Sequence, residues 1–150
     1  MHNLGDMLAV FQNRIFWIGS LAWLIAQILK VTIDLLSKRK IDFRRLVSAG
    51  GMPSSHSAFV VALSTSVGFT QGFDSALFAV SATFAGIIMY DAAGVRRAVG
   101  IQAGILNEIL EDAQKHRPVG EQKLKELIGH TPVEVFAGAV LGFLLSWFLI

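Results

Sequence analysis

Four long stretches that are almost free of charge constrain this chain more than any other feature. They fall at about residues 11–36, 55–70, 74–90 and 132–150. Each approaches the roughly 20 apolar residues that a helix needs to cross a bilayer. Charged residues make up 16% of the chain, against about a quarter in soluble domains. The pattern predicts an all-α fold, with residues 1–150 forming a single integral membrane bundle of about four transmembrane helices.

A fifth helix is predicted between the third and fourth stretches. In "GIQAGILNEILEDAQK", Ile101, Ile105 and Ile109 recur at every fourth position, while the acidic side chains fall mostly off that line. This spacing places the isoleucines on one face of an amphipathic helix. We expect this helix on the cytoplasmic side, packed on the bundle or lying in the membrane interface.

The basic residues predict the orientation of the chain. Twelve of the 13 Lys and Arg residues lie between residues 30 and 52 or between residues 90 and 131, and Arg14 is the exception. With four spans, both segments fall on one side of the membrane, which the positive-inside rule assigns to the cytoplasm. Both termini are then outside, in a bacterial inner membrane or an organellar membrane. We read these residues as topology signals and anion ligands, and expect no nucleic-acid partner.

Two histidines begin predicted membrane helices on that same face. His56 lies in "GGMPSSHSA" before the second span, and His130 lies in "GHTPVE" before the fourth. Helix N-termini favour anions because their N–H groups are unpaired and the helix dipole is positive there. One imidazole can attack phosphorus while another protonates the leaving oxygen. Glu134, one turn after His130, can hold its ring as the acid of a catalytic triad does.

These motifs resemble those of the type 2 phosphatidic acid phosphatase and vanadium haloperoxidase superfamily. "PSSHSA" resembles its central Pro-Ser-Gly-His motif, and "HTPVE" resembles its last motif, in which an acid follows a histidine by four residues. Lys38 and Arg45 reproduce the Lys-x6-Arg spacing of its first motif. The chain is similar to the divergent, short branch of that superfamily over almost its whole length.

The resemblance implies a membrane phosphatase that hydrolyses a lipid phosphate through a phosphohistidine, without metal or other cofactor. It makes His130 the nucleophile, Glu134 its orienting acid and His56 the general acid. Phosphate would be bound by Ser54, Ser55, Lys38, Arg45 and either Arg96 or Arg97, with Lys30 as an alternative to Lys38. The implied substrates are phosphatidic acid, phosphatidylglycerophosphate and polyprenyl pyrophosphates.

The chain also departs from the family pattern. Ser55 stands where the family has glycine, Leu46 replaces the proline after the first-motif arginine, and Glu134 replaces aspartate. In the family, a Ser-Arg pair usually stands shortly before the last histidine. Here the six residues before His130 are "LKELIG", which lack that pair. The arginine function would then come from Arg96 or Arg97.

Three other interpretations stay open from the sequence. "TPVE" is also a capping box, with Thr131 as the N-cap and Glu134 reaching back to it. The protein could bind lipid phosphates, as a scaffold, without turning them over. A metal site could form from His56, His130, Glu134 and Asp91. The small residues in "SATFAG" and "AGAVLG" also allow helices to approach closely, so the bundle could form a homodimer.

Overall fold

The computed structural model describes residues 8–38, 51–114 and 129–150, and in this part of the chain all of the regular secondary structure is helical. The predicted all-α fold is confirmed. The elements in chain order are η1 (Ala9–Gln12), α2 (Arg14–Lys38), α3 (Ser55–Gln71), α4 (Ala76–Ala93), α5 (Val95–Gln114) and α6 (Pro132–Leu149).

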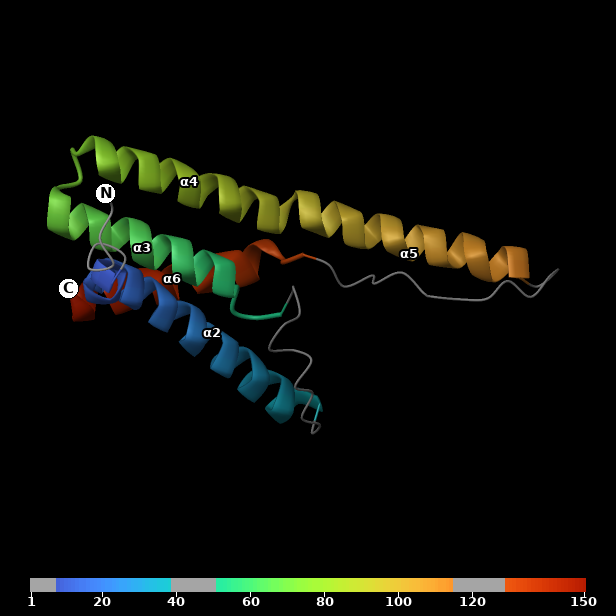
Figure 1. The fold of residues 1–150 in the computed structure, drawn as a ribbon. Helices are drawn as coiled ribbons and strands as arrows, with labels where there is room; N and C mark the ends of the chain where they lie inside the picture. Colours follow the sequence, from blue (N-terminus) through green and yellow to red (C-terminus); the bar gives the residue numbers. More distant parts are fainter. Residues whose placement is uncertain (1–7, 39–50, 115–128) are drawn as a thin grey trace.

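Helix α3 lies at the centre of the bundle, in contact with α2, α4 and α6 (Figure 1). Figure 1 shows α3 and α6 running in one direction and α2 and α4 running in the other. The N-termini of α3 and α6 and the C-termini of α2 and α4 therefore gather at one end of the bundle. At the other end, Arg14 donates a hydrogen bond to the carbonyl oxygen of Leu149.

Glycines allow α3 and α6 to pack backbone against backbone. A Cβ atom added at Gly138 would overlap the carbonyl oxygen of Ser54, and one added at Gly142 would overlap that of Ala58. The two glycines are four residues apart, so they lie on one face of α6. This small-xxx-small arrangement is a common way for membrane helices to approach closely.

Small and hydroxyl-bearing side chains fill the rest of the interior. The apolar core cluster consists of Ile18, Ala22, Ala26, Ala58 and Ala62. Buried hydroxyls link the helices around it: Ser146 donates to the carbonyl oxygen of Ala62 at 2.7 Å, and Ser66 donates to Ser146 at 3.2 Å. Hydrogen bonds of this kind hold helices together where lipid offers no polar partner.

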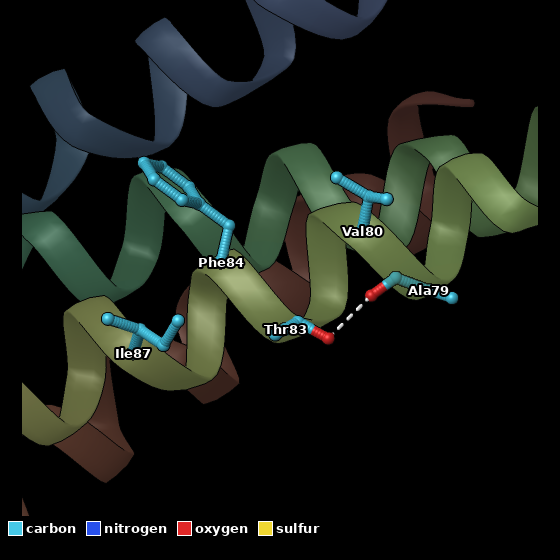
Figure 2. Close-up of a pocket in the computed structure, with 5 residues that line it drawn as sticks. All are labelled: Ala79, Val80, Thr83, Phe84 and Ile87. Atoms are coloured by element: carbon cyan, nitrogen blue, oxygen red, sulfur yellow. Dashed lines mark hydrogen bonds between the residues drawn. The ribbon is translucent and has the colours of Figure 1, made fainter.

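Large apolar side chains cover the outside of the bundle instead of its interior. Trp23, Phe84 and Phe148 are 41%, 58% and 78% exposed, which is the reverse of a water-soluble core. Figure 2 shows one such surface, a shallow recess on the outer side of α4 lined by Ala79, Val80, Thr83, Phe84 and Ile87. The one hydroxyl in this recess, on Thr83, donates to the carbonyl oxygen of Ala79 at 2.8 Å. The recess is therefore suited to lipid chains and offers no group for catalysis.

Within the described residues, three helical stretches are long and apolar enough to cross a membrane: residues 14–36, 76–111 and 132–149. Helix α3, predicted as the second span, has 17 residues and is the most buried helix of the bundle. Its four serines and Thr65 are buried against other helices, so α3 depends on α2, α4 and α6 to separate these hydroxyls from lipid. The chain is thus an integral membrane helical bundle.

The predicted amphipathic helix corresponds to α5, which continues the line of α4 after Gly94 (Figure 1). Its isoleucines at 101, 105 and 109 are exposed, whereas Ala103 and Asn107 are buried. The apolar face of α5 therefore points away from the protein. That orientation suits contact with lipid and does not suit contact with water.

The α3–α6 contact gives a prediction about stability. Gly142→Ala should lower the free energy of unfolding by about 2 kcal/mol or more, because the backbone of α3 cannot move aside as a side chain can. Thermal unfolding in detergent measures the change.

Gly86→Ala is the matched control, because nothing lies within 4 Å of a Cβ atom added at that helical position. We expect its unfolding temperature to equal or slightly exceed that of the native protein. Equal unfolding temperatures for the two variants would contradict the proposed close packing.

Candidate functional site

His130 lies where three helix ends meet. It precedes α6, and Gly129 before it adopts a φ of 112°, a conformation that side-chain-bearing residues seldom adopt. The backbone N–H of His130 donates to the carbonyl oxygen of Ala92 near the end of α4, at 2.9 Å. The His130 side chain is 1% exposed. These contacts hold His130 between the C-terminal end of α4 and the N-terminal end of α6.

The Glu134 carboxylate holds both the helix start and the histidine. Its Oε2 atom accepts the Thr131 N–H at 2.9 Å, and Thr131 Oγ1 accepts the Glu134 N–H at 3.3 Å, which completes a capping box. The same Oε2 atom lies 3.2 Å from His130 Nδ1. One oxygen atom therefore makes both a contact of the capping box and the contact with the histidine ring.

His56 comes to His130 from a different helix. It is the second residue of α3, and its ring centroid lies 6.2 Å from that of His130, with the ring planes at 63°. Catalytic groups act on a proton from about 3 Å. Two imidazoles at this separation are therefore close enough for both to reach one phosphoryl group.

Ser54 and Ser55, the two serines that precede His56, are buried at the start of α3. Ser54 is the N-cap, and its hydroxyl accepts both the Ser57 N–H at 3.3 Å and the Ser57 hydroxyl at 3.0 Å. The Ser54 N–H donates to the carbonyl oxygen of Glu134 at 2.9 Å. Ser54 therefore joins the N-termini of α3 and α6, and Ser55 is the first residue of α3. The structure thus brings His56, His130, Glu134, Ser54 and Ser55 together.

The predicted phosphate-binding cations fall on residues whose side chains the structure does not describe. Arg96 and Arg97 lie in the first turn of α5, shortly after Ala92, and Lys38 is the last residue of α2, but the side chains of all three are outside the description. Arg45 lies outside the described residues altogether. The phosphate-binding roles of these four residues therefore stay predictions from the sequence.

Two polar residues on α2 are buried within the bundle. Lys30, which the sequence offers only as an alternative to Lys38, is 2% exposed, and Gln27, one turn before it, is 5% exposed. The sequence signal for both is a polar side chain within a long, mostly apolar segment, and this signal indicates Gln27 as much as Lys30.

The geometry does not favour the metal-site alternative. In the described part of the chain, no three His, Asp or Glu side chains gather closely enough to hold an ion together. The described site offers a His–Glu pair and a second histidine, which suits acid–base and nucleophilic chemistry.

The fold and the site together define a class of protein: a membrane helical bundle with two histidines at one end. A family model described as the Divergent PAP2 family matches residues 11–145. The chain belongs to that family, which confirms the resemblance drawn from the motifs. It is also similar to the Bacillus subtilis (strain 168) protein called "Uncharacterized membrane protein YuiD", with 48% identity over 144 residues, covering 86% of this chain and 89% of the relative. No solved structure matches the chain significantly.

The shared oxygen of Glu134 gives a prediction about the stability of the site. Thr131→Ala removes one cap hydrogen bond and should lower the free energy of unfolding by about 1 kcal/mol. Glu134→Ala removes the acceptor of both the Thr131 N–H and the buried imidazole N–H. It should therefore lower that energy by a further 1–3 kcal/mol, roughly. Thermal unfolding of the two variants in detergent measures this order, and the reverse order would contradict the double role of Oε2.

Proposed function

We propose that the protein is a membrane phosphatase that hydrolyses a phosphomonoester or pyrophosphate of a lipid through a phosphohistidine. The observation that carries this proposal is the His130–Glu134 pair at 3.2 Å with the His56 ring 6.2 Å away. Family membership supports a phosphatase-like protein, and the geometry supports the roles of these residues.

The contact with Glu134 indicates which nitrogen of His130 attacks. An ionised carboxylate can only accept hydrogen bonds, so Nδ1 carries the proton when it bonds to Oε2. The neutral ring then has its lone pair on Nε2. This is the tautomer that a nucleophilic histidine needs, and the carboxylate also stabilises the positive ring that forms on attack.

The first half of the proposed reaction forms the covalent intermediate. The Nε2 lone pair of His130 forms a bond to phosphorus, and the bond between phosphorus and the leaving oxygen breaks. His56, protonated at the start, gives its proton to that oxygen, so the product leaves as an alcohol or, from a pyrophosphate, as a phosphate. The phosphoryl group remains on His130.

The second half regenerates the enzyme. Neutral His56 takes a proton from a water molecule, whose oxygen bonds to phosphorus as the N–P bond breaks. Inorganic phosphate leaves, His130 returns to its neutral form, and His56 is protonated again. No metal ion is needed to balance these steps.

Charge on the phosphoryl oxygens must be stabilised in both halves. The N-termini of α3 and α6 lie beside the histidines and supply partial positive charge. In this proposal Arg96 or Arg97 and a lysine supply full charges. The positive-inside rule assigns this end of the bundle to the cytoplasm, where a lipid headgroup could enter while its chains stay in the bilayer.

Burial of His130 bears on how the substrate binds. At 2% exposure, the ring cannot touch a phosphoryl group unless neighbouring groups move aside. The same burial keeps water from the His130 ring before substrate binds, which strengthens its pairing with Glu134.

Phosphate release by the detergent-purified protein, measured on a panel of lipid phosphates with a chelator present, tests the proposal. We expect release by the native protein and a loss of at least about 10³-fold in His130→Asn. His116→Asn is the matched control, because His116 has no role in the proposed site, and it should keep native activity. Release that requires a divalent ion, or that survives in His130→Asn, would contradict the mechanism. Binding without release would favour the non-catalytic interpretation.

Glu134→Gln tests the orienting role separately. Loss of the negative charge should lower kcat by about 10²-fold or more, with a much smaller effect on KM, because the charge on the ring develops only during reaction. Thr131→Ala, which keeps the carboxylate, should stay within a few-fold of native kcat. Similar losses in the two variants would show that Glu134 acts only through the helix cap.

A further inference from the structure

We propose that Gly138, on α6, is a positioning residue: because it carries no side chain, it sets the distance between the His56 and His130 rings. This inference rests on the proposed function, since it concerns the geometry of the same site. The sequence offered Gly138 only as part of "AGAVLG", a motif for close approach between helices and for contact with a second copy of the chain. In the structure, Gly138 is buried and faces α3.

Gly138 lies against the first turn of α3. A Cβ atom added there would overlap the carbonyl oxygen of Ser54 and would lie 3.0 Å from the Cβ atom of Ser57. Carbon atoms in contact normally stay about 3.5–4.0 Å apart. The atoms that an alanine would meet belong to the backbone or are attached to it directly, so they cannot rotate aside. An alanine at this position would therefore push the start of α3 away from α6.

A short series of contacts connects this crossing to both histidines. His56 follows Ser54 by two residues on α3. The Ser54 N–H donates to the carbonyl oxygen of Glu134 at 2.9 Å, and the Glu134 carboxylate lies 3.2 Å from His130 Nδ1. Glu134 and Gly138 are one turn apart on the same face of α6. Moving Ser54 away from α6 therefore moves His56 away from His130.

The separation of the two rings matters because both must act on one phosphoryl group. Their centroids lie 6.2 Å apart, and a group that transfers a proton must come within about 3 Å of its target. A misplacement of about 1 Å can lower the rate of an enzyme by about 10²-fold. The crossing at Gly138 therefore bears on the rate of the proposed reaction as well as on stability.

Gly142 supports the same crossing one turn further along α6, where it meets Ala58 and Ala62 of α3. Gly138 differs from it because it meets Ser54, the residue whose N–H joins α3 to Glu134. Gly138 therefore acts on the interhelical hydrogen bond that lies beside the histidines.

A purely structural role for Gly138 is the main alternative, and Ser146 provides the matched control. Ser146 belongs to the same α3–α6 interface but lies near the end of α6, far along the helix from His130. Its hydroxyl donates to the carbonyl oxygen of Ala62 at 2.7 Å. Ser146→Ala removes this hydrogen bond and weakens the interface. It adds no atom between the helices, so it should leave the rings in place.

The ring contact is measured first, because that measurement needs no activity. NMR of the detergent-purified protein labelled only at its four histidines gives a simple spectrum, which variants lacking one histidine at a time assign. We expect a nuclear Overhauser contact between ring protons of His56 and His130 in the native protein and in Ser146→Ala. We expect Gly138→Ala to lose it. An unchanged contact in folded Gly138→Ala overturns the inference.

Turnover of lipid phosphates then tests the consequence for the reaction. Gly138→Ala should lower kcat by at least about tenfold with a much smaller change in KM, because ring positions matter most in the transition state. Ser146→Ala should keep kcat within a few-fold of native. Thermal unfolding shows which variants are folded at the assay temperature. If Gly138→Ala does not fold, Ser57→Thr takes its place, since it adds one methyl group near the same crossing and keeps the hydroxyl.

The two measurements distinguish this inference from the proposed function. Loss of the ring contact in Gly138→Ala alone supports the positioning role even if the native protein releases no phosphate, and the proposed function then fails by itself. Loss of the contact with unchanged kcat overturns the control of the reaction by ring distance. Equal losses of kcat in Gly138→Ala and Ser146→Ala reduce the role of Gly138 to stability and overturn the inference. A native protein without the ring contact overturns both proposals.

Discussion

The close crossing of α3 and α6 is the contact on which the rest of the structure depends. Gly138 and Gly142 let the two backbones meet, and the Ser54 N–H then reaches the Glu134 carbonyl oxygen at 2.9 Å. Because the helices run in the same direction, their N-termini arrive together. His56 at the start of α3 and His130 just before α6 are thereby brought close to each other. A bulkier residue at either glycine would separate the helices and the two rings with them.

Small and polar side chains fill the interior, and the bundle can use them because it is surrounded by lipid. Alanine, glycine and serine pack between the helices, and the large apolar side chains face outward. Lipid replaces water as the surrounding medium, so apolar burial gives little energy and close packing with hydroxyl bonds supplies it instead. This leaves α3, with its run of buried serines and threonine, dependent on its neighbours. The same dependence fixes the position of His56 at its start.

Two residues of the site each make two structural contacts. Glu134 caps α6 and holds His130 through one oxygen atom. Ser54 caps α3 and ties it to α6. Such sharing means that helix formation and assembly of the site are the same event.

The sequence by itself determined the helical membrane fold, the positions of His56 and His130 at helix starts, and the family. Hydropathy, capping residues and charge bias are local, so they can be read along the chain. Only the tertiary structure decided that one Glu134 oxygen serves both cap and histidine, that Ser54 is joined to α6, and that Gly138 lies against the start of α3. Those facts depend on which faces of separate helices meet. Gly138, Gly142 and the alanines of α2 determine which helix faces meet. Such contacts join residues far apart in the sequence, so a local pattern does not predict them.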